Sequence, residues 1–237
     1  MSMINISTND VHIWTIPLTE WSSHESLFLL NSDEKQRAYR YRFEEHKRQF
    51  VNARAGLKRI LSYYLALAPE TIQLDYTAHA KPFLKSNALQ FNLSHSDELA
   101  LCAISQTMKL GIDIEKIKTL DYIGIANRFF SESENTALST LPEDKQLNSF
   151  FQLWTSKEAV LKAMGTGLHL PLSYFSLPLQ KKIHTLNIDN QHWSVYPLET
   201  SEKYCATLAS SHNIHFLQYW ELSKTSYECK KIMQLSF

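Results

Sequence analysis

The chain has 237 residues, of which 44% are hydrophobic and 12% aromatic, and its 24 Lys and Arg residues balance 24 Asp and Glu residues. This composition excludes a disordered protein, and zero net charge argues against a surface that binds polyanions throughout. No apolar run approaches the ~18 residues that a membrane-spanning helix needs, and we expect no secretory signal. Cys102, Cys205 and Cys229 form no C-x-x-C pair, so we expect reduced thiols in a cytoplasmic protein without a membrane partner.

The first half is expected to begin with one strand and then pass from helices to strands. The alternating segment Val11–Ile16 predicts a strand, and Ser32 opens a basic helical region. Apolar residues at helical spacing predict a helix over Phe50–Leu67, which Pro69 ends. Short β-like runs follow at Ile72–Tyr76, Leu89–Leu93 and Leu99–Ile104.

The second half repeats this order. Leu110–Glu115 predicts a strand, and helices follow from about Tyr122 to Gly165, with Ser131 and Glu134 spaced as a capping box. Three further strands are expected near Trp193–Tyr196, Tyr204–Ala209 and Phe216–Leu222. The repetition predicts an α+β fold of two similar α/β lobes, residues 1–109 and 110–237.

The segment Trp154–Lys162 contains an acid within an apolar helical stripe. At about 100° per residue, Glu158 falls between apolar neighbours. The stripe consists of Leu147, Phe150, Phe151, Trp154, Leu161 and Met164. Burying an unpaired carboxylate is costly, so we expect a cation, a hydrogen-bond partner or a raised pKa at Glu158. Lys162 is spaced for an ordinary i,i+4 surface pair with it, and Lys157 is expected on the other side of the helix, toward solvent.

A second acidic feature lies on the strand predicted at Leu110–Glu115. Period-2 alternation places Gly111, Asp113 and Glu115 on one face, and next-but-one residues lie about 6.5 to 7 Å apart. Gly111 leaves space for a close approach of backbone or ligand. Two such acids alone more often form a solvated strand face. Together with Glu158 they predict a site for Mg²⁺ or Mn²⁺.

Two further features fit either anion binding or an ordinary surface. In Phe91–Asp97 a strand ends in Ser94 and His95, a turn that could hold phosphate or a ribose hydroxyl, although a polar hairpin is the simpler interpretation. A Ser/His/Asp hydrolase is a poor interpretation because no G-x-S-x-G elbow is present. The segment from Lys35 to Arg59 contains nine Lys or Arg residues but only two Glu residues, which indicates a local anion site or a basic helix surface.

These segments together resemble the Sfp-type 4′-phosphopantetheinyl transferases over about residues 32 to 210. The matching blocks are Ala80–Phe83, Phe91–Ser96, Gly111–Glu115, Arg128–Ser131, Trp154–Ala159 with Lys162, and Gly165–Leu172. The resemblance implies transfer of phosphopantetheine from coenzyme A to a serine of an apo acyl or peptidyl carrier protein, the holo-[acyl-carrier-protein] synthase reaction, with release of adenosine 3′,5′-bisphosphate. It also implies a pseudo-dimer of two α/β lobes with coenzyme A and Mg²⁺ between them.

The resemblance also implies a role for each acid and for one lysine. Asp113, Glu115 and Glu158 would hold Mg²⁺, and Glu158 would be the general base for the carrier serine. Lys162 would stabilise or protonate the leaving phosphate. The N-terminal lobe would bind coenzyme A, and the C-terminal lobe would carry the acids and the catalytic helix.

Coenzyme A contacts are implied for a second set of residues: Lys81, Ser94, His95, Arg48 and Lys35. Arg48 and Lys35 are included because Gln49 occupies the position where the family often has an arginine that binds the 3′-phosphate. Carrier docking is expected near Lys116–Phe130, where apolar side chains accompany basic ones. We expect a monomer, because a two-lobed chain can complete its own site.

Two other functions compete with the transferase. The same acids could serve a metal-dependent phosphohydrolase that acts on water. Alternatively, Lys35–Arg59 could form a nucleic-acid or partner-binding module with structural acids, although few aromatic residues are interleaved with its basic residues. The transferase explains the three acids, the lysine and the anion site together, so we expect no nucleic-acid partner.

Overall fold

A computed structural model of the chain describes residues 3–167, 170–179, 182–223 and 226–234. It divides into two compact units. The first comprises Met1–Asp75, Pro82–Thr107 and Ile214–Phe237, and the second comprises Tyr76–Lys81 and Met108–Asn213. The longest continuous stretch of the second unit begins at Met108. Residues from 214 onward, which the sequence placed in the C-terminal lobe, instead belong to the first unit.

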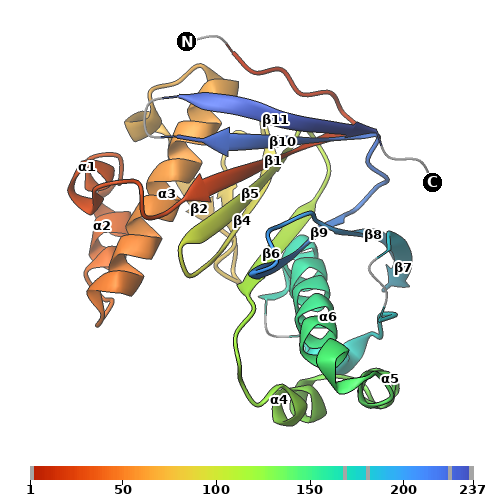
Figure 1. Ribbon diagram of the computed structural model, residues 1–237. Coiled ribbons are helices and arrows are strands. Elements are labelled where there is room, and N and C mark those ends of the chain that lie inside the picture. The colour runs from red at the N-terminus through yellow and green to blue at the C-terminus, as the bar shows by residue number, and fades with distance from the viewer. Residues whose placement is uncertain (1–2, 168–169, 180–181, 224–225, 235–237) are drawn as a thin grey trace. The chain divides into compact units, whose positions relative to one another are not determined.

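The sheet of the first unit joins strands from both ends of the chain (Figure 1). Its strands are β1 (Asp10–Pro17), β4 (Gln90–Ser96), β5 (Leu99–Ser105), β10 (Phe216–Leu222) and β11 (Tyr227–Gln234), in the order β11-β10-β1-β5-β4. β1 pairs in parallel with β10 and antiparallel with β5. This pairing of β1 with β10 is why the C-terminal strands belong with the first unit. The short strands β2 (Leu74–Tyr76) and β3 (Pro82–Leu84) form a separate two-stranded sheet.

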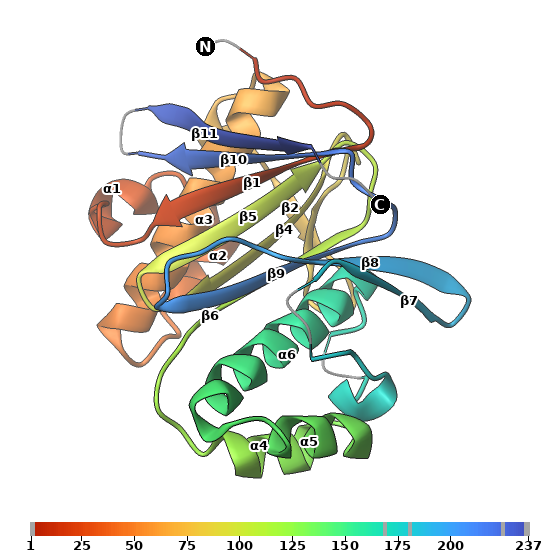
Figure 2. The ribbon, with the colours of Figure 1, turned by 45° about the vertical axis from the view of Figure 1, so that its right-hand side comes forward.

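The helices of the first unit are α1 (Ser23–Leu27), α2 (Ser32–Ala38) and α3 (Glu44–Leu65), followed by a 3₁₀ turn at Pro69–Thr71. α3 lies along the sheet (Figure 2) and buries Leu57, Ile60 and Leu61 in a core with Trp14 and Ile16 of β1. It begins before the predicted Phe50, because Glu44 and Glu45 favour the first turn of a helix. It ends at Ala66, which has a left-handed φ of 52°.

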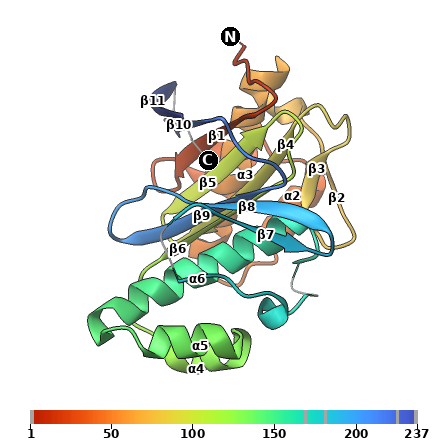
Figure 3. The ribbon, with the colours of Figure 1, turned by 90° about the vertical axis from the view of Figure 1, so that its right-hand side faces the viewer.

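The second unit is a four-stranded antiparallel sheet with one long helix against it (Figure 3). Its strands are β6 (Leu110–Lys116), β7 (His184–Ile188), β8 (Gln191–Pro197) and β9 (Tyr204–Ser210), in the order β6-β9-β8-β7. Its helices are α4 (Tyr122–Phe129), α5 (Glu132–Ser139) and α6 (Glu143–Met164), with a 3₁₀ turn at Leu172–Tyr174. α6 packs on β6, β8 and β9, whereas α4 and α5 pack on the side of α6 away from the sheet (Figure 3).

The predicted α+β class is confirmed, and each unit places a strand, then helices, then further strands in chain order. The strands β3, β7 and β11 and the helix α1 were not predicted. The capping box of Ser131 and Glu134 is confirmed, as is the end of the long helix at Gly165, whose φ is 75°. Leu168 and His169 of the motif Gly165–Leu172 lie outside the described residues. In the described parts of the chain, no helix is long and apolar enough to cross a membrane.

Candidate active site on β6 and α6

The strand β6 presents its acidic face toward α6. A Cβ atom on Gly111 would collide with the backbone oxygen of Ala159 and the backbone nitrogen of Ala163, so only glycine allows the helix to approach this closely. This contact confirms the close backbone approach that the sequence predicted. Asp113 is buried and Glu115 is half-buried on the same strand. Two carboxylates therefore lie on the strand that α6 contacts most closely.

Glu158 provides the third carboxylate, from α6. Its side chain is half-buried rather than enclosed in the apolar stripe as predicted. Burial raises the pKa of Glu158, the charge of Lys162 opposes the rise, and the charges of Asp113 and Glu115 add to it. The expected rise in pKa is therefore present, and the three acids lie within electrostatic reach of one another.

Lys162 bridges the helix and the strand, and its charge also acts on Glu158. Its Nζ lies 2.6 Å from Oδ1 of Asp113, with side chains 29% and 5% exposed. A charge-assisted hydrogen bond to a buried carboxylate is stronger than an exposed ion pair, so this contact holds the ammonium group beside the acids.

The three acids suit a hard cation in chemistry but do not form a finished metal site. Carboxylate oxygens are the ligands that Mg²⁺ prefers. Among the described residues, no group of three or more His, Cys, Asp or Glu side chains is arranged to hold a metal ion. Here the ammonium of Lys162 neutralises Asp113. Metal binding would therefore require side-chain rearrangement around Asp113, Glu115 and Glu158.

Lys81 joins the start of β6 to the end of α6. Its Nζ donates hydrogen bonds to the backbone oxygens of Leu110, at 2.9 Å, and Lys162, at 2.6 Å. Burial, and secondarily the charge of Lys109, lowers the pKa of Lys81 to about 8. Lys81, which the sequence predicted to contact the phosphates of coenzyme A, is thus held next to the acidic strand and helix.

The other predicted coenzyme A residues lie in the first unit. Ser94 is buried and His95 is exposed, and both belong to β4 rather than to the predicted turn, which occurs at Asp97 with a φ of 55°. Lys35 on α2 and Arg48 on α3 are half-buried. The Nε atom of Arg48 is buried and has no hydrogen-bond partner among the residues that the structure describes.

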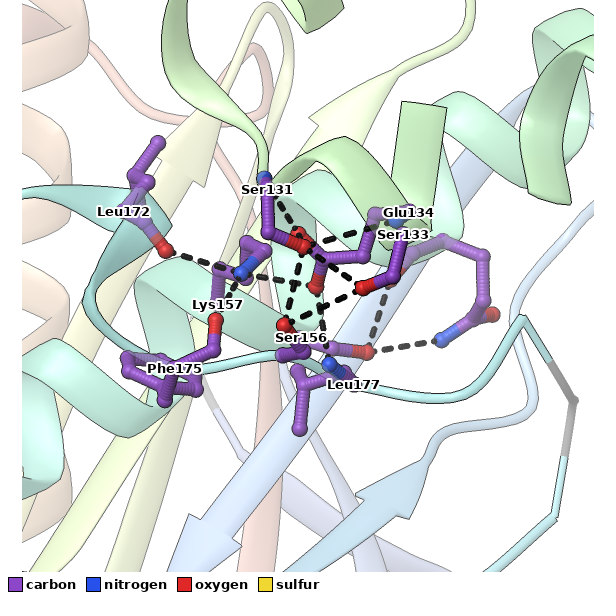
Figure 4. Close-up of polar contacts among 10 residues, drawn as sticks. Ser131, Ser133, Glu134, Ser156, Lys157, Leu172, Phe175 and Leu177 are labelled. Atoms are coloured by element: carbon purple, nitrogen blue, oxygen red, sulfur yellow. Dashed lines mark hydrogen bonds and ion pairs between the residues drawn. The ribbon is translucent and has the colours of Figure 1, made fainter. Parts of the chain in front are cut away.

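The prediction for Lys157 is wrong, because this side chain points inward and is completely buried (Figure 4). Its Nζ lies 2.7 Å from Oε1 of Glu134 and donates to the backbone oxygens of Leu172 and Phe175. Burial lowers the pKa of Lys157, while the hydrogen bond and charge of Glu134 oppose this shift. The periodicity argument failed because α6 is buried against the sheet on one side and against α5 on another. In the sequence, the capping box of Ser131 and Glu134 was the pattern that could have indicated Glu134 as the partner of Lys157.

An apolar cleft of about 160 Å³ adjoins Glu115. Trp154 contributes to it from one turn before Glu158, and Glu115 contributes from β6. The full lining is Glu115, Lys118, Leu120, Ile125, Phe150, Phe151 and Trp154. The cleft therefore connects the acidic strand with the segment that leads into α4.

Comparisons with known proteins agree over both units. A family model described as the 4′-phosphopantetheinyl transferase superfamily matches residues 109–226, and one described as 4′-phosphopantetheinyl transferase, N-terminal, matches residues 13–107. The chain is 41% identical over 172 residues to the 4′-phosphopantetheinyl transferase HetI of Nostoc sp., covering 70% of this chain and 73% of that protein. It is 34% identical to the transferase gsp of Aneurinibacillus migulanus, covering 76% and 77%. It is 29% identical to the transferase Sfp of Bacillus subtilis, covering 70% and 73%.

Proposed function

This chain belongs to the 4′-phosphopantetheinyl transferase superfamily, and from that premise we propose how its residues carry out the reaction. The enzyme transfers the phosphopantetheine group of coenzyme A to carrier proteins. The observation that supports the proposed site is the raised pKa of Glu158, which lies in the field of two strand acids and one lysine. A carboxylate whose pKa is raised in this way is a better proton acceptor than an ordinary surface carboxylate.

Glu158 acts as the general base in this proposal. It takes the proton of the carrier serine, and the serine oxygen forms a bond to the phosphorus next to the pantetheine arm. The bond from that phosphorus to the bridging oxygen breaks, so adenosine 3′,5′-bisphosphate leaves with the electron pair. Lys162 lies one helical turn after Glu158 and would stabilise the charge of the leaving phosphate or protonate it.

Asp113, Glu115 and Glu158 would hold Mg²⁺ in this proposal. When bound, the ion would supply positive charge to the pyrophosphate of coenzyme A. Burial is the main cause of the raised pKa of Glu158, and the negative charges of Asp113 and Glu115 add to it, so a cation at this position would be stabilised by all three carboxylates. Lys162, which is already 29% exposed, would leave Asp113 for the phosphate.

Lys81, Arg48, Lys35, Ser94 and His95 would contact coenzyme A. Lys81 is mostly protonated at neutral pH, since its pKa is about 8, and it is anchored at β6 and α6. Arg48 is half-buried on α3, and its guanidinium would donate to the 3′-phosphate. His95 is exposed on β4 and is therefore accessible to a nucleotide.

The carrier would dock on the segment from Lys116 to Phe130. Ile123 and Phe129 are 55% and 36% exposed there and would provide apolar contacts for a carrier. Lys118 and Arg128 are exposed in the same segment and would attract an acidic carrier surface. The cleft beneath Ile125 adjoins Glu115, so a carrier bound here would be close to the acidic strand.

Intact-mass spectrometry of an apo carrier protein incubated with coenzyme A tests this proposal. One phosphopantetheine should be added in the presence of Mg²⁺, with adenosine 3′,5′-bisphosphate formed in equal amount. Chelation should stop the reaction, and added Mg²⁺ should restore it. Carriers that remain unmodified across a panel of fatty-acid, polyketide and peptide types would contradict the transfer. Release of adenosine 3′,5′-bisphosphate without a carrier would instead favour the phosphohydrolase.

A further inference from the structure

The buried ion pair of Lys157 and Glu134 satisfies every proton of the lysine ammonium group. Its three acceptors are Oε1 of Glu134, at 2.7 Å, and the backbone oxygens of Leu172, at 2.8 Å, and Phe175, at 2.5 Å. The aromatic ring of Phe175 lies 4.6 Å from the same nitrogen. A buried charge with complete hydrogen bonding and fixed geometry constrains its surroundings more than a hydrophobic contact of equal size.

Glu134 extends the same network to α5 and to the chain beyond α6 (Figure 4). Its Oε2 accepts hydrogen bonds from the backbone nitrogen and the hydroxyl of Ser131, each at 2.9 Å. Its Oε1 accepts a hydrogen bond from the backbone nitrogen of Leu177, at 2.8 Å. The N-terminus of α5 and the segment 172–177 are therefore both connected by hydrogen bonds, through Glu134 and directly, to Lys157 on α6.

Lys157 is the residue directly before Glu158. On the opposite side, α6 contacts β6 at Gly111 so closely that no side chain fits between them. α6 is thus held from two sides, by the strand that carries Asp113 and Glu115 and by the ion pair at Lys157. A rotation or sliding of α6 that moved Glu158 away from the strand acids would have to break one of these contacts.

We propose that Lys157 and Glu134 are positioning residues for the reaction, which set the rotation and axial position of Glu158 relative to Asp113 and Glu115. The inference rests on the proposed function of Glu158. It assigns Lys157 no contact with substrate, because its side chain is 0% exposed and all three of its protons are bound within the protein. The catalytic effect of the pair is exerted through Glu158.

The first unit contains a matched control for this inference. Lys58 is also 0% exposed and also the fifteenth residue of a 22-residue helix. Its Nζ lies 2.8 Å from Oε2 of Glu34, which forms the capping box of the preceding helix. The residue after Lys58 is Arg59, whose guanidinium lies 4.7 Å from the centre of a Trp21 ring. A buried lysine–glutamate pair at the same helix position thus exists without an acid after it, and its Glu34 also lies 3.7 Å from the Nε of Arg54.

The experiment compares the double variant Glu134→Gln/Lys157→Met with Glu34→Gln/Lys58→Met. Both remove the charges of a buried pair and retain much of its shape, and buried hydrogen-bonding groups that lose their partners should lower the denaturation midpoint. We expect the first variant to lose at least tenfold in kcat, with KM for coenzyme A and carrier changed by less than threefold. Its Mn²⁺ affinity, measured by calorimetry, should fall at least tenfold. The second variant should keep kcat and Mn²⁺ affinity within twofold of the wild type.

Equal losses of kcat in the two variants, or wild-type kcat and Mn²⁺ affinity in Glu134→Gln/Lys157→Met, would overturn the inference. If a double variant does not fold, the single substitutions Lys157→Met and Lys58→Met give the same comparison, because Glu134 and Glu34 keep backbone hydrogen-bond donors; we expect a loss of at least threefold in kcat for the former only. Glu158→Gln separates this result from the proposed function. Its full activity would refute the proposed base, whereas an inactive Glu158→Gln beside unaffected Lys157 variants would refute only the positioning.

Discussion

The two long helices, α3 and α6, have the same length and the same kind of buried lysine–glutamate pair, but they carry different side chains next to that pair. Each has 22 residues, buries a lysine at its fifteenth position against a capping-box glutamate, and ends in a left-handed residue. The residue after the lysine is Arg59 in α3 and Glu158 in α6. The shared helix arrangement therefore does not determine the chemistry. The chemistry depends on the side chain that follows the buried lysine.

The strands under the two helices extend this difference. β1 places Trp14 and Ile16 beneath α3, within an apolar core. β6 places Asp113 and Glu115 near Glu158, whose pKa is raised mainly by burial and further by these two charges. In the first unit, the contact between helix and strand is an apolar core. In the second unit, part of the equivalent contact is a partly exposed cluster of charged side chains.

The largest expected difference concerns the glycines where each helix meets its strand. In Gly111→Ala, the new methyl group would meet the backbone of α6 at Ala159 and Ala163, which cannot yield without moving the helix. We expect a loss of more than about 3 kcal/mol in the free energy of unfolding. In Gly56→Ala, the methyl group would lie 2.8 Å from the side-chain atom Cγ2 of Ile16. Relief by side-chain movement and better helix propensity should limit that loss to about 1 kcal/mol.

Urea unfolding of the two variants measures this contrast. Equal losses would show that the approach of α6 to β6 is no tighter than that of α3 to β1. A larger loss for Gly56→Ala would reverse the comparison.

A smaller difference should appear in the dependence of stability on pH. His12 on β1 is 1% exposed, its Nδ1 lies 2.7 Å from the hydroxyl of Tyr64, and burial lowers its pKa to about 4. The unfolded chain therefore binds more protons than the folded one between pH 4 and about 6.5, so acid destabilises the fold through His12. The full effect is about 3 kcal/mol, present in full only below pH 4. Glu158 has the opposite sign, because its raised pKa makes the folded state bind more protons as the pH falls.

Unfolding of the wild type and of His12→Phe at pH 7 and pH 5 tests this account. The loss of stability between the two pH values should be smaller in the variant by about 2 kcal/mol. Identical losses would show that His12 is not held neutral by burial.

Local patterns in the sequence predicted the elements of the site well. Alternation placed Asp113 and Glu115 on one face of a strand, and the spacing of Ser131 and Glu134 gave the capping box, because both features depend only on neighbouring residues. The raised pKa of Glu158 was also predicted, although the side chain is only half-buried and, besides burial, the charges of Lys162, Asp113 and Glu115 contribute to the shift.

Features that depend on distant partners could not be predicted in this way. The inward position of Lys157 requires Leu172 and Phe175, whose backbone oxygens carry no sequence signal. The parallel pairing of β1 with β10 joins opposite ends of the chain, so a division at residue 109 could not anticipate it. The hydrogen bonds of Lys81 to backbone oxygens have the same origin.

The most direct test of the proposed active site is the rate of carrier modification by Glu158→Gln, followed by intact-mass spectrometry. The substitution removes the proton acceptor while it retains the shape of a half-buried side chain, so the variant should fold with little change in stability. We expect it to leave an apo carrier unmodified during a period in which the wild type modifies all of it. A folded Glu158→Gln enzyme that transfers phosphopantetheine at the wild-type rate would contradict the assignment of the chemistry to α6.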